Sequence, residues 1–179
     1  MTSNRLAQII LGERYGVRPE TVELAPNLET MLEQADACVL IGDIGMMTDG
    51  SGLTVLDLGA EWVALTGKPF VWAAWIGNEK VTPELAWWLN RAAACVGSSD
   101  GAEPEYIWRN RKTMVARAMS QANWPEETAR DYFESVMAYK MDDSMLEGLR
   151  EYQRRLLANG FEDATHFPEL IGAAEGAVA

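Results

Sequence analysis

A short apolar run that stops at a glycine and an aspartate constrains the fold of this chain most strongly. Residues 37–41 are all apolar, which is typical of a strand buried on both faces of a sheet. The run ends at Gly42 and Asp43, where backbone and a carboxylate would meet solvent at the carboxyl end of the strand. Ligands of open α/β sheets bind at this end of the strands. The segment therefore predicts an α/β fold with a candidate site at Gly42 and Asp43.

A second apolar run, residues 70–76, follows a segment with helical character that is punctuated by Gly67 and Pro69. Asp57 precedes that segment and is expected to cap a helix over residues 58–65. Two buried strands that are joined through a helix form an α/β crossover. The sheet is therefore predicted to be at least partly parallel.

The charge of the chain excludes several classes of partner. The 179 residues carry a formal net charge of −12, with a pI near 4.5, which argues against nonspecific binding to nucleic acid or to an anionic membrane. No cleavable apolar leader and no apolar run of membrane-spanning length is present, so we expect a cytoplasmic protein with no membrane partner.

His166 is the single histidine and there is no CxxC motif, so no metal site is expected. Cys38 and Cys95 do not form a disulfide framework.

The halves of the sequence differ in character. We expect an α/β region over residues 1–78, a helical region over residues 79–170 and a frayed tail over residues 171–179. The expected helices after residue 80 cover residues 82–94, 106–121, 125–138 and 144–159. In the last of them, Ser144 and Glu147 have the spacing of a capping box. A stripe at spacing i, i+4, i+7 and i+11 gives this helix one apolar face: Met145, Leu149, Tyr152 and Leu156.

Two polar positions are candidates for chemistry. Thr2 and Ser3 stand at the start of a periodic segment that ends at Tyr15 and Gly16. Hydroxyls and free N–H groups at a helix start suit a carboxylate or a phosphate, although the same residues could simply cap the helix. Asp43 could serve as a general acid or base or orient a ligand hydroxyl, and equally could be a turn or cap residue.

Three segments resemble chorismate dehydratase, the first enzyme of the futalosine route to menaquinone. They are residues 40–43 (Leu-Ile-Gly-Asp), 57–62 (Asp-Leu-Gly-Ala-Glu-Trp) and 65–75 (Leu-Thr-Gly-Lys-Pro-Phe-Val-Trp-Ala-Ala-Trp). The opening Thr2 and Ser3 look like the Thr-Ser element of that family, and residues 137–149 look like its C-terminal helix entry. Lys68 and Trp72 depart from the family pattern, which usually has Leu and often has Phe at these positions.

The resemblance implies a fold similar to periplasmic solute-binding proteins of type 2, with substrate in a cleft between two lobes. It implies removal of water from chorismate, a small dicarboxylate, to give 3-[(1-carboxyvinyl)oxy]benzoate without a cofactor. Carried over by residue, it places Thr2 and Ser3 at a cleft-facing helix start. It places Gly42 and Asp43 at a strand end that faces the ligand, with Asp43 as the catalytic candidate.

We expect the chain to lack the leading segment of that family, which would leave the first lobe incomplete and make residues 1–78 mainly the second lobe. Three functional alternatives follow: a dehydratase lobe that is inactive alone, a non-catalytic module that binds a small carboxylate, and an interaction protein that joins a partner chain. If the partner is a second copy, the exposed helical face and the tryptophans predict a homodimer.

Overall fold

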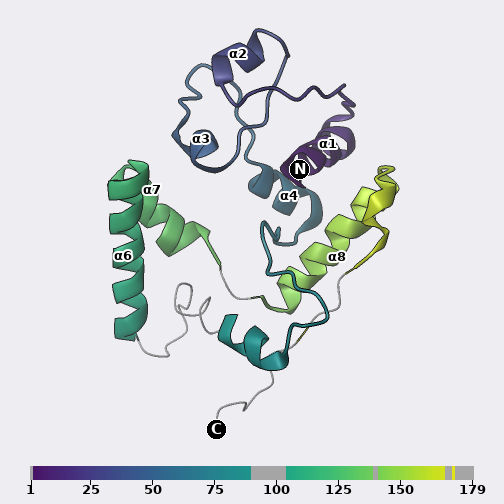
Figure 1. The fold of residues 1–179 in the computed structure, drawn as a ribbon. Coiled ribbons are helices and arrows are strands. Elements are labelled where there is room, and N and C mark those ends of the chain that lie inside the picture. The colour runs from purple at the N-terminus through teal and green to yellow at the C-terminus, as the bar shows by residue number, and fades with distance from the viewer. Residues whose placement is uncertain (1, 90–103, 139–140, 168–170, 172–179) are drawn as a thin grey trace. The chain divides into compact units, whose positions relative to one another are not determined.

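The computed structural model describes residues 2–89, 104–138, 141–167 and 171, and for residues 104–110 it describes the backbone only. The chain divides into two compact units. Unit 1 combines residues 1–74 with residues 142–167, and unit 2 combines residues 75–141 with residues 168–179. Residues 142–167 were predicted to belong to the helical region 79–170, but they lie in unit 1 with the N-terminal region. Figure 1 shows the order of the elements along the chain.

Unit 1 is built on three helices: α1 (Thr2–Tyr15), α4 (Leu58–Thr66) and α8 (Asp143–Ala158). Helix α1 packs on both α4 and α8, and the short 3-10 turn η2 (Glu162–Thr165) folds back on α8. Two shorter helices, α2 (Leu28–Leu32) and α3 (Gly42–Met47), bury none of their residues. The predicted first helix is confirmed, including its end at Tyr15, after which Gly16 takes a left-handed φ of 68°.

One aromatic residue holds the core of unit 1 together. Trp62 of α4 is fully buried, and its indole Nε1 donates a hydrogen bond to the carbonyl oxygen of Pro69 at 3.2 Å. The rings of Phe70 and Tyr152 meet it edge to face, with centroids 5.4 and 5.9 Å away. The remaining buried members of this core come from α1 and α8: Leu6, Ile9, Ile10 and Leu156. The apolar face predicted for the last helix is therefore confirmed at Tyr152 and Leu156.

Local polar contacts set the helix ends, and one of the predicted caps is wrong. Asp57 caps α4 as predicted, because its Oδ1 accepts from the N–H of Ala60 at 2.7 Å. Helix α8 is capped by Asp142, whose Oδ1 accepts from the N–H of Met145 at 3.0 Å. Ser144 instead donates its hydroxyl to that same carboxylate at 2.8 Å. An aspartate at this position both accepts the N–H and favours the positive end of the helix dipole, so it displaces serine as the cap.

Glu147, the other half of the predicted capping box, does not reach back to the helix start. Its carboxylate accepts from Lys68 Nζ at 2.6 Å, across 79 residues of sequence. The contact lowers the pKa of Glu147 through the hydrogen bond and the charge of Lys68. A long-range partner has therefore replaced the local one that the sequence pattern indicated.

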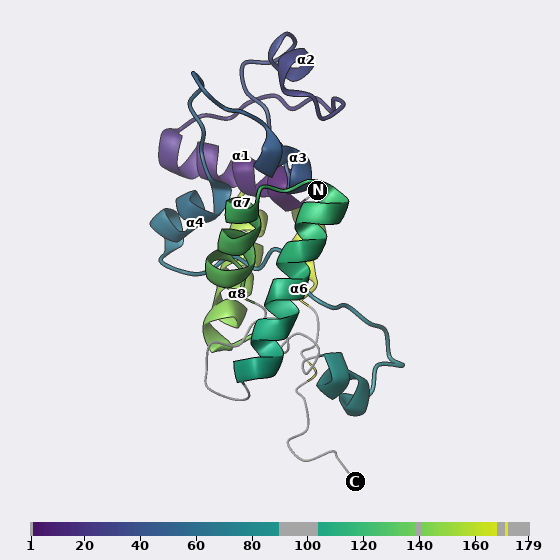
Figure 2. The same cartoon turned by 90° about the vertical axis from the view of Figure 1, so that its left-hand side faces the viewer.

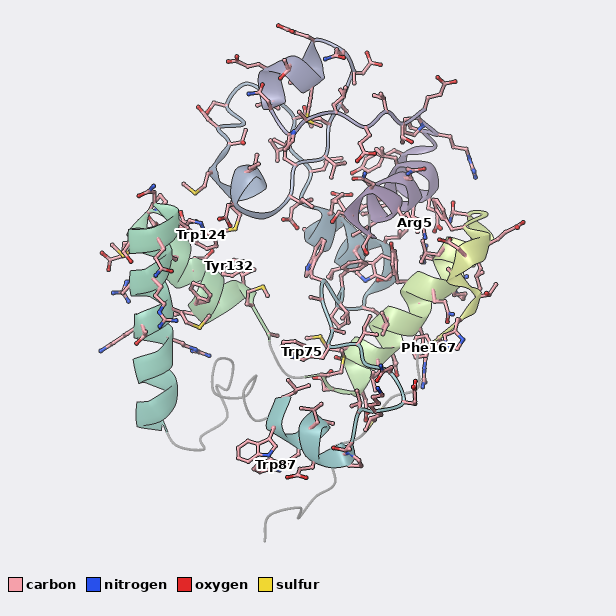
Figure 3. The ribbon with its side chains drawn as sticks, viewed as in Figure 1. Arg5, Trp75, Trp87, Trp124, Tyr132 and Phe167 are labelled. Atoms are coloured by element: carbon pink, nitrogen blue, oxygen red, sulfur yellow. The ribbon has the colours of Figure 1, made fainter. Side chains whose placement is uncertain are left out.

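Within unit 2, residues 104–136 form a helical hairpin. Helix α6 (Pro104–Ala122) turns at Asn123, which has a φ of 55°, into α7 (Glu126–Asp131) and then the π-helical turn η1 (Tyr132–Val136). Trp124 is buried between these elements, and Figure 3 shows it beside Tyr132, whose ring centroid lies 5.2 Å away. The expected helix at residues 82–94 begins with Pro83, and Thr82 Oγ1 accepts from the N–H of Leu85 at 3.2 Å. Its expected end and Cys95 lie outside the described residues.

The two predicted strands have no strand partner in the part of the chain that the structure describes. Residues 37–41 and 70–76 are neither helical nor paired as strands, and no strand occurs among the described residues. A strand satisfies its backbone only against a neighbour, which local sequence cannot supply. Phe70 nevertheless points into the core of unit 1, while Trp72, Trp75 and Ile76 are exposed.

Candidate functional site

The start of α1 presents two hydroxyl groups that no other described residue engages. The helix begins at Thr2, so Thr2 and Ser3 lie within its first turn, Thr2 exposed and Ser3 half-buried. The first turn carries no acidic residue. The first N–H groups of a helix lack partners inside the helix, and the helix dipole favours an anion near them. The start of α1 therefore suits a negatively charged group.

A hollow of about 260 Å³ adjoins this helix start and is lined by Thr2, Arg5, Tyr152 and Leu156. The Tyr152 hydroxyl donates to the backbone oxygen of Thr2 at 3.1 Å, which ties the start of α1 to the middle of α8. Burial raises the pKa of Tyr152 to about 12, against a smaller opposing effect of the Arg5 charge. The phenol is therefore neutral near pH 7, so the hollow combines a cation, hydroxyls and an apolar wall.

The cation of the hollow is already paired. Arg5 donates from Nη1 and Nη2 to the two carboxylate oxygens of Asp163, at 3.0 and 2.7 Å. Its guanidinium carbon lies 5.1 Å from the centroid of the Phe161 ring, which supports the planar group from one side. The hydrogen bonds from Arg5 lower the pKa of the Asp163 carboxyl. Figure 3 shows Arg5 on the side of α1 that faces α8.

The second predicted pair, Gly42 and Asp43, begins the short helix α3. Gly42 has a φ of 62°, a left-handed conformation that glycine adopts without strain. Asp43 is exposed in the first turn of α3, where its charge suits the helix dipole, and no other described residue pairs with it. A turn or cap position is the predicted alternative to a catalytic role for Asp43.

Both predicted pairs lie in unit 1, although no hydrogen bond joins them among the described residues. Helix α3 lies nearer to the N-terminal end of α1 than to its C-terminal end in both views (Figures 1 and 2). Thr2 and Ser3 begin α1, and Gly42 and Asp43 begin α3.

Sequence reasoning missed two residues that line the hollow. Arg5 follows Thr2 by three residues, and positions i and i+3 share a helix face, so this spacing could have identified it. Tyr152 was assigned to an apolar stripe, yet a buried tyrosine hydroxyl needs a partner, and that need was a usable signal. Asp163 reaches Arg5 across 158 residues, which no local pattern reveals.

Other kinds of site find no support in the described residues. Among them, no three side chains of His, Cys, Asp or Glu gather as a metal-binding group. Cys38 is half-buried and carries a free thiol. Within the same residues, no helix has the length and apolar character that crossing a bilayer requires.

Comparison with known families places this chain beside a known family. Residues 1–158 match the model of a protein family described as menaquinone biosynthesis. The match covers residues 1–74 and 142–158 of unit 1 and residues 75–141 of unit 2, and it includes all four predicted site residues.

Proposed function

This chain belongs to the menaquinone biosynthesis family, and we propose that it acts there as chorismate dehydratase. The observation that carries the proposal is the start of α1, where the hydroxyl of Thr2 and the guanidinium of Arg5 line one hollow and Ser3 follows in the same helical turn. Chorismate is a dicarboxylate, and such a substrate needs local donors rather than a positive net charge. A local site of this kind is compatible with the net charge of −12.

The proposed reaction asks little of the protein beyond positioning and proton transfer. Removal of water from chorismate breaks one ring C–H bond and one C–O bond and leaves an aromatic ring, so the products are strongly favoured. The site has to hold the dianion, accept the ring proton and assist departure of the hydroxide. We assign carboxylate binding to Thr2 and Ser3 and proton transfer to Asp43. Gly42 would let the backbone approach the substrate closely.

We propose as well that unit 1 corresponds to one lobe of a fold like that of the type 2 periplasmic solute-binding proteins. Residues 37–41 and 70–76 would then be strands once they are paired, since both are apolar and non-helical. Amide hydrogen exchange tests this assignment. Slow exchange of these backbone N–H groups in solution supports it, and exchange as fast as in residues 17–26, which also lack regular structure, contradicts it.

Chorismate turnover is the direct test of the reaction. The purified chain is incubated with chorismate, and loss of substrate and formation of the aromatic enol ether are followed by chromatography. Asp43→Asn and Ser3→Ala should each lower turnover by at least about tenfold. Asp36→Asn removes the same charge from an exposed aspartate seven residues earlier and should leave turnover unchanged. Turnover that is equal in Asp43→Asn and Asp36→Asn would rule out the role given to Asp43.

The exposure of Thr2 and Asp43 favours a second candidate function, which is binding of a small carboxylate without turnover. A general base works best where water is excluded, and neither residue is enclosed by described parts of the chain. This candidate predicts that chorismate raises the melting temperature of the chain and is recovered unchanged. A homodimer or another partner chain also stays a prediction, to be tested by light scattering.

A further inference from the structure

The guanidinium of Arg5, which lines the hollow at the start of α1, is paired with a carboxylate of the chain itself, that of Asp163. The contact between Arg5 and Asp163 uses two parallel N–H···O bonds, at 3.0 and 2.7 Å. This is the geometry with which arginine recognises the carboxylates of ligands. Asp163 thus stands where the carboxylate of a ligand could stand. The pair shows that the two N–H donors of Arg5 are oriented to bind both oxygens of a carboxylate.

The Arg5 side chain is held by its neighbours, whereas the Asp163 carboxylate is mostly exposed and can easily be replaced by another carboxylate. The guanidinium of Arg5 lies over the Phe161 ring. Arg5 belongs to α1, and the next residue of that helix, Leu6, is fully buried. Asp163 stands on the four-residue turn η2 with its side chain 64% exposed, against 35% for Arg5. Ion pairs formed in contact with water contribute little stability, so another carboxylate can replace Asp163 at low cost.

The hollow supplies what a bare arginine would lack. The hollow that Arg5 lines is also lined by Thr2, whose hydroxyl no described residue engages, and by Tyr152 and Leu156, which form an apolar wall. An aromatic or cyclic carboxylate could therefore set its anionic group against Arg5 and Thr2 and its ring against Tyr152. A small inorganic anion would gain only the first of these contacts.

We propose that Arg5 binds a carboxylate of the substrate in this hollow and that Asp163 competes with the substrate for the guanidinium. The identity of the substrate rests on the proposed function, whereas the competition rests on the contacts alone. In the ligand-free chain Asp163 fills the fork. When a cyclic carboxylate enters, its anionic group takes over the two N–H donors and the Asp163 carboxylate turns to water. Asp163 then sets the affinity threshold that a ligand has to exceed.

Binding of isophthalate, a stable aromatic dicarboxylate, tests the competition without requiring catalysis. Its affinity for the full chain is measured by isothermal titration calorimetry at low ionic strength, where charge effects are least screened. Asp163→Asn should tighten binding by about threefold, the size expected for release of an exposed ion pair. Glu162→Gln is the matched control, because it removes the same charge one residue earlier, where no described residue pairs with it. It should leave the affinity unchanged.

The arginine variants complete the test. Arg5→Gln should weaken isophthalate binding by at least about fivefold, and Arg5→Lys should fall between this variant and the parent, since lysine keeps the charge but loses the fork. In the Arg5→Gln background, adding Asp163→Asn should no longer change the affinity. Melting curves establish that each variant is folded before it is compared.

The proposal is overturned if Asp163→Asn and Glu162→Gln have the same affinity, if Arg5→Gln binds as the parent does, or if no variant binds isophthalate. Its failure is distinguishable from failure of the proposed function. Isophthalate binding that follows the predicted order without chorismate turnover would remove the dehydratase and keep the competition. Chorismate turnover without the predicted order of isophthalate affinities would keep the dehydratase proposal and remove the competition.

Discussion

Gly148 lies at the closest approach between α8 and the segment that follows α4. A Cβ atom at this position would overlap the carbonyl oxygen of Pro69 and lie 3.2 Å from its carbonyl carbon. That oxygen accepts the hydrogen bond from Trp62, so Pro69 cannot move aside without breaking a contact in the core. We therefore predict that Gly148→Ala destabilises unit 1, although alanine is the better helix former.

Opposing effects set the size of this loss. Replacing glycine by alanine inside a helix is worth about 1 kcal/mol in favour of the folded state. Forcing a methyl group into a packed contact costs about 1–3 kcal/mol, and weakening the buried indole hydrogen bond costs about 1 kcal/mol more. The net expectation is a decrease of about 2 kcal/mol in the free energy of unfolding. For a chain of this size this corresponds to a melting temperature lower by about 4–8 °C.

Gly12 provides the matched control in α1. A Cβ at Gly12 would meet only Asn159 Oδ1, at 4.0 Å, so Gly12→Ala should gain about 0.5–1 kcal/mol from helix propensity alone. Urea unfolding followed by circular dichroism measures both variants. If Gly148→Ala stabilises the chain as much as Gly12→Ala does, the close contact between α8 and Pro69 does not exist in solution, and the reasoning is refuted.

Three further predictions concern the contacts of unit 1. In urea titrations, Asp142→Ala should lower the free energy of unfolding by about 1 kcal/mol, and Ser144→Ala should lower it by less than about 0.5 kcal/mol. The reverse order would make Ser144 the cap of α8. Trp62→Phe should cost about 2 kcal/mol in the same assay, because it removes the bond to Pro69 and part of the buried area; a neutral result would contradict the central role of this indole. The pKa of Tyr152 is about 12 in the folded chain and 10.0 without burial. Its contribution to stability is therefore full below about pH 10 and is lost as the pH rises toward about 12. Unfolding midpoints at about pH 9 and about pH 11 should differ less in Tyr152→Phe than in the parent, and an equal difference would exclude this linkage.

Local sequence patterns predicted the local structure of unit 1 well. The helix from Thr2 to Tyr15, the cap at Asp57 and the apolar stripe that buries Tyr152 each depend on residues within one or two helical turns. The capping box at Ser144 was wrong because two acceptors compete for the same N–H groups. The spacing of Ser144 and Glu147 does not show that Asp142, two residues before Ser144, is the better acceptor.

The features that the sequence did not reveal are those set by distant partners. Lys68 pairs with Glu147 and Arg5 pairs with Asp163, across 79 and 158 residues. The candidate site was accordingly predicted as two local pairs, Thr2 with Ser3 and Gly42 with Asp43. Of these four residues only Thr2 lines the hollow, together with Arg5, Tyr152 and Leu156. The strands at residues 37–41 and 70–76 stay predictions for the same reason, since the pairing that defines a strand is not local.

The division of unit 1 into two sequence segments has a consequence for synthesis of the chain. Trp62 and Phe70 are made early, but the residues that cover them, Tyr152 and Leu156, leave the ribosome about eighty residues later. Unit 2 can therefore complete its hairpin while the first segment still exposes an open aromatic surface. Nascent chains arrested before residue 142 should be cleaved readily by protease within residues 1–74, and chains released after residue 167 should resist. The core of unit 1 can therefore close only after its second segment has been made.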